Sequence, residues 1–361
     1  MEKMEINYTL PSKEFWQGKK VLLTGHTGFK GSWLTFWLNR MGADITGISL
    51  EPNTTPNLYS LLNIEKLCES IICDIRDKEL LKSHIHRVQP EIIFHLAAQP
   101  LVRESYDSPL ETFSINTLGT ANLLDSLINL KSLKSVVVIT TDKVYFNNEW
   151  DWPYREEDRL GGYDPYSASK AASELILESY KKSFFLNQGL SIASARAGNV
   201  IGGGDWSKDR LIPDAIKAWQ NNKKLIIRSP NSIRPWQHVL DPLCGYILLA
   251  ENLYNTKITD AAFNFGPLTH EAATVSQIVE KARKLYGYGL IEYVNDCSNK
   301  HEAGLLTLDI AKSIKILNHY PRWHLNIALE KSILWYKNLK NGLNACDLCN
   351  LDIDSFEKYY E

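Results

Sequence analysis

The strongest constraint on the fold lies near the N-terminus, where a short apolar run meets a glycine-rich turn. Residues 19–24 (KKVLLT) have the composition of a buried parallel strand, and a helical pattern runs from Ser32 to Met41. Between them, the spacing G-x-x-G-x-x-G places glycines where the backbone approaches a pyrophosphate over a helix N-terminus. The chain is therefore expected to bind a dinucleotide. The residues expected at its phosphates are Gly25, His26, Thr27, Gly28, Phe29, Lys30 and Gly31.

Strand-like and helical segments alternate along the chain, which predicts a doubly wound α/β fold of the Rossmann type with a parallel sheet. In such a sheet, ligands bind at the carboxyl ends of the strands. Helical patterns run over residues 110–130 and 166–185. The strands are expected at residues 19–24, 44–50, 70–73, 92–96, 135–139 and 191–195.

The length of 361 residues leaves room for a smaller second domain beside this sheet. The glycine joint at residues 202–204 marks the passage between the two. We expect a dinucleotide-binding domain in residues 1–203, completed by residues 237–255. A smaller substrate domain of mixed α/β structure is expected in residues 204–236 and 256–361.

Composition excludes several classes of partner. The net charge of -2 gives no electrostatic reason to expect nucleic acid or an anionic membrane surface. No apolar stretch approaches the roughly 18 residues that span a bilayer, and the polar N-terminus does not resemble a signal peptide, so we expect a cytoplasmic protein. Six cysteines are scattered, and the Cys346/Cys349 pair stands alone, so we expect surface thiols there and no metal site.

The residues that follow the strands predict how the dinucleotide is held. Either Ser49 or Glu51 is placed to bind the adenine ribose after the second strand, and nothing basic occurs from Leu50 to Asn63 to hold a ribose phosphate. This pattern favours NAD over NADP. The other residues expected at the cofactor are Asp74, Ile75, Ala97, Ala98, Gln99 and Asn116.

Two short segments carry the expected chemistry. Tyr166 and Lys170 lie four residues apart and so share one helix face, where the ammonium is expected to lower the pKa of the phenol and make it a usable base. Asp142 and Lys143 follow an apolar strand and provide a second acid/base couple. Because hydride transfer alone needs only the first couple, the second one points to a further proton transfer, such as elimination of water.

Several longer segments resemble the extended short-chain dehydrogenase/reductases that act on nucleotide sugars, and most closely the branch that dehydrates CDP-glucose. The similarity extends over most of the chain from Lys19 to about Trp323. The segments that carry it are residues 25–34 (GHTGFKGSWL), 52–58 (PNTTPNL), 97–103 (AAQPLVR), 161–170 (GGYDPYSASK), 196–214 (RAGNVIGGGDWSKDRLIPD), 233–240 (IRPWQHVL) and 263–267 (FNFGP).

The resemblance implies a redox-neutral dehydration. Tyr166, assisted by Lys170, would take the proton of the glucose C4 hydroxyl while NAD oxidises C4, and Thr141 would hydrogen-bond the C4 oxygen. Asp142 would protonate the C6 hydroxyl as it departs, and hydride would return to C6. Lys143 would either remove the C5 proton or, as a cation, stabilise the enolate oxygen.

Two other classes of function stay in view. An epimerase of nucleotide sugars needs only the Tyr166/Lys170 couple and usually has small polar residues at positions 142 and 143. A non-catalytic nucleotide-binding protein would have lost Tyr166 or Lys170, and both are present.

The resemblance also suggests substrate contacts and an assembly. Helices corresponding to residues 110–130 and 166–185 pair across a two-fold axis in relatives, so a homodimer or homotetramer is expected. His301 recurs in the family and is either a substrate contact or structural. The remaining candidates are Asn199, Arg228 and Arg234 for the diphosphate, Leu211 and Pro213 for the base, and Gln99, Arg103 and Ser105 for the hexose.

Overall fold

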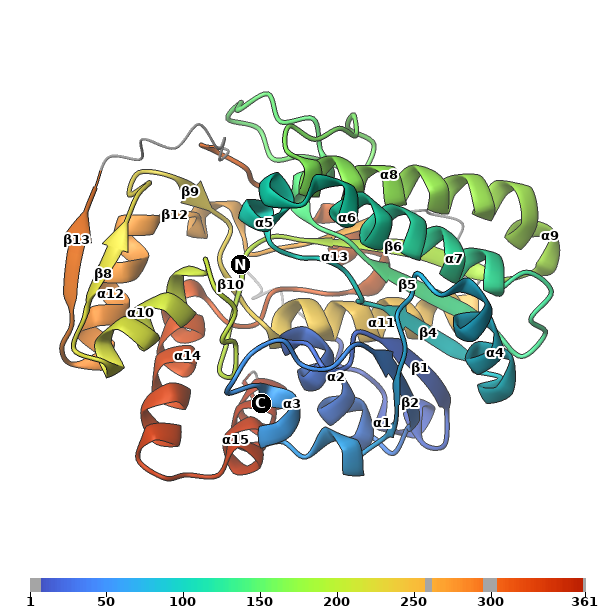
Figure 1. Ribbon diagram of the computed structural model, residues 1–361, viewed down its shortest axis with the longest axis horizontal. Helices are drawn as coiled ribbons and strands as arrows, with labels where there is room; N and C mark the ends of the chain where they lie inside the picture. The colour runs from blue at the N-terminus through green and yellow to red at the C-terminus, as the bar shows by residue number, and fades with distance from the viewer. Residues whose placement is uncertain (1–7, 257–261, 295–303, 360–361) are drawn as a thin grey trace, which may run out of the picture.

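A parallel sheet forms the centre of the molecule. The computed structural model describes residues 8–256, 262–294 and 304–359, and within them seven parallel strands form one sheet in the order β11-β6-β5-β4-β1-β2-β3 (Figure 1). The predicted α/β fold is confirmed, and each predicted strand overlaps an observed one. The strands are β1 (Lys20–Thr24), β2 (Asp44–Ser49), β3 (Glu69–Ile72), β4 (Ile92–His95), β5 (Ser135–Ile139), β6 (Ser191–Ala197) and β11 (Ala262–Phe265).

Helices cover both faces of the sheet (Figure 1). Successive side chains of a strand point to opposite faces, so Leu22 packs into one hydrophobic core whereas Val21 and Leu23 pack into the other. Because both faces are buried, the central strands are mostly apolar, as in the segment Val136–Ile139 of β5. The first core includes α4 (Lys78–Val88), α7 (Gly119–Ser126) and α8 (Pro165–Tyr180), and the second includes α2 (Phe29–Arg40) and α11 (Leu240–Thr256).

The two long helical patterns are each interrupted by a π-helical turn. The first pattern becomes α6 (Pro109–Phe113), the turn η2 (Ser114–Leu118) and α7, and the second becomes α8, the turn η4 (Lys181–Phe185) and α9 (Leu186–Gln188). Helix α8 begins sharply because the Asp164 side chain accepts a hydrogen bond from the backbone N–H of Ser167, with Pro165 in the first helical position. This start places Tyr166 in the first turn, at the carboxyl end of β5.

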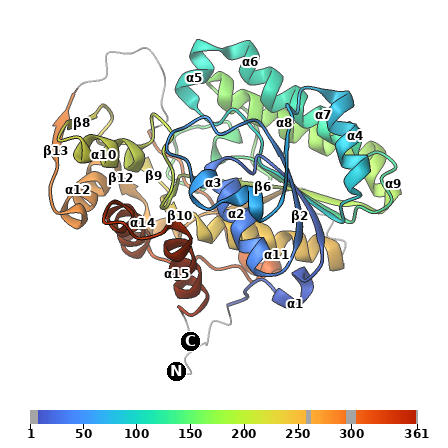
Figure 2. The same cartoon turned by 60° about the horizontal axis from the view of Figure 1, so that its bottom comes forward.

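A second lobe lies beside the sheet (Figure 2). Its β8 (Lys224–Ile227) and β13 (Leu290–Tyr293) pair in parallel, with α10 (Leu211–Gln220) packed against β8. The other elements of this lobe and its junction are β7 (Val200–Ile201), β9 (Ile233–Arg234), β10 (Gln237–His238), η5 (Thr269–Glu271), β12 (Ala273–Thr274), α12 (Val275–Tyr286), α14 (Leu325–Lys340) and α15 (Ala345–Glu357). Helix α13 (Ala311–Leu317) packs against α11 and β11 at the main sheet. Short elements beside the sheet are α1 (Lys13–Trp16), α3 (Leu58–Leu61), η1 (Ile64–Lys66), α5 (Val102–Asp107) and η3 (Asp142–Val144).

One strand crosses the predicted domain boundary. The sequence assigned residues 256–361 to the substrate domain, yet β11 pairs with β6 at the edge of the main sheet. All of its residues are buried there, which explains why this apolar segment joins the sheet. Helix α11 also packs against β5 and β6, as expected for residues 237–255. The functional division into two domains stays a prediction, with β11 moved to the first.

Among the described residues, no helix is both long and apolar enough to cross a membrane.

A buried ion pair fastens α8 to the sheet. The Arg196 guanidinium on β6 donates to both carboxylate oxygens of Glu174 on α8, at 2.9 and 2.8 Å. Hydroxyl groups of Thr140 and Ser194 donate to the same carboxylate at 2.6 and 2.7 Å. Burial alone would raise the pKa of Glu174, but Arg196 and the two hydroxyls hold it below the ordinary value. The pair therefore fixes α8 against β5 and β6.

Replacing Arg196 with Met should lower the free energy of unfolding by about 3–5 kcal/mol, because it leaves the Glu174 carboxylate buried without its cation. The matched control is Arg87→Met, which breaks the exposed Arg87–Glu69 pair and should cost less than about 1 kcal/mol. Urea unfolding of both variants measures the difference. Equal losses would show that the buried pair does not fasten α8.

Candidate active site

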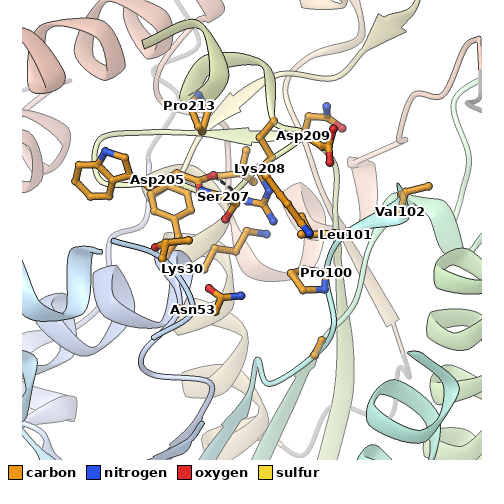
Figure 3. A pocket seen from close by; sticks show the side chains of 18 of the residues that line it. Lys30, Asn53, Pro100, Leu101, Val102, Asp205, Ser207, Lys208, Asp209 and Pro213 are labelled. Atoms are coloured by element: carbon orange, nitrogen blue, oxygen red, sulfur yellow. Dashed lines mark hydrogen bonds and ion pairs between the residues drawn. The ribbon is translucent and has the colours of Figure 1, made fainter. Parts of the chain in front are cut away.

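A large cavity opens at the carboxyl ends of the strands, where the second lobe faces the sheet. Its volume is about 1050 Å³. Figure 3 shows Lys30 and Asn53 on the sheet side, Pro100 to Val102 on another wall, and the segment carrying Asp205 to Asp209 across from them. The cavity therefore lies where a doubly wound fold binds its ligands.

The glycine turn after β1 forms a cradle that only glycine fits. Gly25 has φ +80°, and a Cβ there would lie 2.7 Å from the Ala97 backbone nitrogen. A Cβ on Gly31 would lie 2.0 Å from the Gly25 carbonyl oxygen. Gly28 caps the N-terminus of α2 and lines the cavity without a side chain. This is the arrangement that lets a pyrophosphate rest on a helix N-terminus, so the residues fit the predicted dinucleotide.

Most of the other predicted cofactor residues line the same half of the cavity. The Ser49 hydroxyl at the end of β2 hydrogen-bonds the Thr27 hydroxyl at 2.8 Å, which ties the end of β2 to the glycine turn. Glu51 follows as an exposed residue of the lining. The predicted cofactor residues that line the cavity are Gly25, Thr27, Gly28, Phe29, Lys30, Gly31, Ser49, Glu51, Asp74, Ile75, Ala97, Ala98, Tyr166 and Lys170.

The His26 side chain does not reach the cavity, which corrects its assignment to the cofactor. The imidazole is fully buried and its Nε2 lies 2.7 Å from the Ser70 hydroxyl. The ring lies over Gly47, where a Cβ would come within 2.3 Å of it. Burial lowers the pKa of His26 to about 4, so the ring is neutral near pH 7. The buried ring packs against β2 and supports the glycine turn from inside the protein.

Three more predicted ligands have side chains engaged inside the protein. The Asn116 amide bonds the backbone of Gln99, and the Gln99 amide donates to Thr112 and to the Leu101 carbonyl. The Ser105 hydroxyl donates to the Val102 carbonyl at 2.7 Å. Neither Gln99, Asn116 nor Ser105 is part of the cavity lining. Their hydrogen bonds shape the loop after β4, and their assignment as direct ligands is corrected.

The predicted catalytic side chains meet at the centre of the cavity. Tyr166 and Lys170 come from α8, and Thr141, Asp142 and Lys143 follow β5. The Tyr166 hydroxyl hydrogen-bonds the Thr141 side chain. The Thr141 hydroxyl also lies 2.9 Å from Asp142 Oδ1 and donates to it. One hydroxyl therefore connects the phenol with the carboxylate.

The electrostatic relation between Tyr166 and Lys170 differs from the expected one. Burial raises the pKa of Tyr166 to about 12, and Arg210 is the cation that acts against this. The Lys170 ammonium instead donates to the Ile139 carbonyl at 2.9 Å. Burial lowers the pKa of Lys170 to about 8, against the attraction of Glu174. The prediction that Lys170 lowers the pKa of Tyr166 is therefore wrong for this structure.

Asp142 offers one free carboxylate oxygen. The residue is 1% exposed, and among the described residues its Oδ2 has no hydrogen-bond partner. Gly198 leaves room beside this atom, because a Cβ there would lie 3.1 Å from it. Lys143 is half-buried and lines the same cavity. An acid, a phenol and a lysine thus face one space, which suits a sequence of proton transfers.

The sequence analysis missed three side chains at this site. Arg210 donates to the buried Asp205 carboxylate at 2.9 Å, and both residues line the cavity near Tyr166. Tyr246 on α11 is fully buried beside Tyr166 and Asp142. Arg210 and Asp205 could have been found from the sequence, because both lie in the segment 196–214 that carries the family resemblance, just after the glycine joint.

The predicted substrate residues lie at the second-lobe side of the cavity. Arg228 lies 3.8 Å from the Asp209 carboxylate, and Arg234 is buried with its guanidinium donating to the Ile233 carbonyl. His301 lies outside the described residues. The predicted substrate residues that line the cavity are Arg103, Asn199, Leu211, Pro213, Arg228 and Arg234.

Similarity to known proteins agrees with this geometry. CDP-glucose 4,6-dehydratase of Salmonella typhimurium is 49% identical over 332 residues, which are 90% of this chain and 92% of that protein. A dTDP-D-glucose 4,6-dehydratase of Dictyostelium discoideum is 26% identical over 94% of this chain and 85% of that protein.

Two solved structures show the same fold. UDP-glucose 4-epimerase of Thermotoga maritima, with UDP-glucose, superposes with a TM-score of 0.78 at 21% identity, covering 89% of this chain and 99% of that one. A dTDP-glucose 4,6-dehydratase of Streptomyces venezuelae, with NAD and TYD bound, gives 0.77 at 22% identity, covering 90% and 99%. The family model of GDP-mannose 4,6 dehydratase matches residues 22–322, and this chain belongs to that family.

Proposed function

We propose that this protein dehydrates CDP-glucose to CDP-4-keto-6-deoxyglucose with NAD as its cofactor. The observation that carries the proposal is the buried Asp142 carboxylate, joined through Thr141 to Tyr166 in one cavity. A 4-epimerase needs the Tyr166/Lys170 couple alone, whereas elimination of water also needs an acid. The 49% identity to CDP-glucose 4,6-dehydratase supports both the reaction and the cytidine base.

The first step is oxidation at C4, and Tyr166 is its base. The bound dinucleotide supplies the hydride acceptor for C4 and later the donor for C6. The Tyr166 oxygen takes the proton of the C4 hydroxyl, with the Thr141 hydroxyl holding the C4 oxygen. This step needs the phenolate form of Tyr166, which burial disfavours, and the nearby positive charge of Arg210 stabilises that form.

The second step belongs to Asp142 and Lys143. For this step Asp142 is the protonated acid, with its proton on Oδ2, the oxygen that has no hydrogen-bond partner among the described residues. The proton passes to the C6 hydroxyl, which leaves as water, and Asp142 becomes the carboxylate. Lys143 faces the same space and acts at C5, either as the base or as a cation beside the enolate.

The second lobe holds the nucleotide sugar in this proposal. Arg228 and Arg234 suit the diphosphate, because a guanidinium binds phosphate oxygens in a fork. In this proposal, Asn199 contacts the diphosphate and Arg103 contacts the hexose. Leu211 and Pro213 contact the nucleotide base. Cytoplasmic location is part of the proposal and is supported by the free thiols of Cys68, Cys73, Cys244, Cys346 and Cys349. Cys349 is fully buried and Cys346 is half-buried, so the expectation of surface thiols at this pair is wrong.

We also propose that two copies associate through α6 to α9. Large apolar side chains are exposed along this layer, with Leu118 59% exposed and Leu175 62% exposed. Helices α7 and α8 lie side by side on the outer face of the sheet (Figures 1 and 2). A second copy related by a two-fold axis would cover this apolar surface and give a homodimer or homotetramer.

Incubation with CDP-glucose and NAD should yield a product lighter by one water. The value of kcat/KM for CDP-glucose should exceed that for dTDP-glucose by at least about 100-fold, because the 49% identity is to a CDP-glucose 4,6-dehydratase. Mass spectrometry and initial rates measure both quantities. Equal values for the two substrates would contradict the proposed base while leaving the dehydration intact.

Asp142→Asn should separate oxidation from dehydration. The amide oxygen can still accept from Thr141, but the group no longer donates a proton to C6, so water loss should fall by about 10²-fold or more. C4 oxidation should continue, and absorbance of the reduced dinucleotide should accumulate in a single turnover. Tyr166→Phe serves as the control that loses both steps. Water loss at the wild-type rate in Asp142→Asn would remove Asp142 as the acid.

The double variant Leu118→Glu/Leu175→Glu should be monomeric at micromolar concentration, because each new carboxylate would be buried against the second copy. Leu290→Glu is the control, since Leu290 is 60% exposed on β13 in the other lobe. Sedimentation velocity measures the assembly. If wild-type protein is itself monomeric, the proposed interface is wrong.

A further inference from the structure

The cavity wall beside α10 and β8 is mostly apolar. These two elements pack against each other, and both contribute residues to the cavity lining. Where a wall has few polar groups, those few decide which edge of a flat ligand ring fits against it. The apolar lining residues here are Leu211, Ile212, Pro213, Leu225, Ile226 and Ile227.

Asp214 is the acidic residue of α10, and it belongs to this wall. It lies three residues after Leu211, so the two share one face of the helix, and both line the cavity. Its side chain is half-buried. Lys217, one turn later, also lines the cavity, but its ammonium donates to the Trp206 carbonyl. Asp214 is therefore the polar group of this helix face that a ligand would meet.

The Asp214 carboxylate keeps acceptor capacity for such a ligand. In the described part of the chain it forms no ion pair, and its donor is the backbone N–H of Asp209. Two carboxylate oxygens can together accept about four hydrogen bonds. Burial raises the pKa of Asp214 to about 6, against the attraction of Lys217, so at pH 8 the group is ionised and only accepts.

The same wall begins where the diphosphate is proposed to bind. Arg228 follows β8 directly, and its guanidinium lies 3.8 Å from the carboxylate of Asp209, which comes shortly before α10. A nucleotide whose phosphates are held at Arg228 can therefore lay its base along α10 and β8. The phosphates are common to all nucleotide sugars, so they give no preference among bases.

Cytosine differs from uracil and thymine at the edge that an acceptor would read. Its 4-amino group donates hydrogen bonds, whereas the other two bases have a 4-oxygen that only accepts. A carboxylate facing this position attracts the amino group and repels the oxygen, because two acceptors would meet without a proton between them. One acidic side chain thus both favours cytosine and rejects its competitors.

We propose that the Asp214 carboxylate selects the cytosine base of the substrate by accepting a hydrogen bond from its 4-amino group. The inference rests on the proposed function, because it takes a cytidine diphosphate sugar as the substrate and Leu211 and Pro213 as contacts of its base. It goes further by assigning the base preference to one side chain, which no other part of the proposed site explains.

Titration calorimetry with CDP and UDP measures this preference without turnover. The two ligands differ only at positions 3 and 4 of the base, and UDP lacks the methyl group of thymine, so size plays no part. The protein is saturated with NAD and held at pH 8, where Asp214 is ionised. Wild-type protein should bind CDP at least about tenfold more tightly than UDP, as expected for one such contact.

Two substitutions of Asp214 should remove most of this preference. In Asp214→Asn the CDP-to-UDP affinity ratio should fall to within about threefold, because an amide offers an oxygen to the amino group or an NH₂ to the 4-oxygen. Asp214→Leu suits the apolar wall and should lose the ratio through weaker CDP binding. Glu104→Gln is the matched control. Glu104 also lines the cavity, on α5, where it pairs with Lys208, and its loss should leave the ratio unchanged.

A wild-type protein that binds CDP and UDP equally would overturn the proposal. A ratio that stays at the wild-type value in both Asp214 variants would also overturn it. Equal weakening of both ligands gives this second result, and is expected if the carboxylate binds the ribose hydroxyls or only supports α10. Failure of the proposed function is a separate observation, because it appears as the absence of water loss when wild-type protein is given CDP-glucose.

Discussion

The buried pair of Glu174 and Arg196 is the interaction on which the site depends. It connects α8 to β6 directly and to β5 through the Thr140 hydroxyl. Thr141 follows Thr140 at once, and Lys170 lies one helical turn before Glu174. The phenol of α8 and the carboxylate after β5 therefore meet because a charged contact in the core holds the elements that carry them. Removing one partner of such an ion pair destabilises the fold, because the remaining charge stays buried.

The cavity also contains acid and base groups whose pKa values differ from their ordinary values. Burial raises the pKa of Tyr166 to about 12 and lowers that of Lys170 to about 8 and that of Lys30 to about 7. Each shift marks a group whose charged form is disfavoured by burial and becomes favoured beside a ligand of opposite charge. The protein thus holds its acid/base groups ready for a reaction in which protons move at C4, C5 and C6 in turn.

Local patterns in the sequence were sufficient to predict the strands, the glycine turn and the Tyr166/Lys170 helix face, because each depends on neighbours along the chain. Contacts between distant segments were not predictable in this way. His26 turns under the sheet because Gly47 leaves space for its ring, and Gln99 is drawn inward by Thr112. The direction of Lys30 depends on Tyr246, more than two hundred residues later. Strand β11 was missed although Gly266 and Pro267 follow it, because its place in the sheet depends on pairing with β6, far away in the chain.

The central claim is that one cavity moves hydrogen within a single sugar, from C4 to C6, while water leaves. The direct measurement uses CDP-glucose labelled with deuterium at C4, with product analysed by NMR and mass spectrometry. We expect the deuterium to appear at C6 of a 4-keto product in each turnover. Deuterium retained at C4 of an epimerised sugar, or released to dinucleotide in solution, would contradict it.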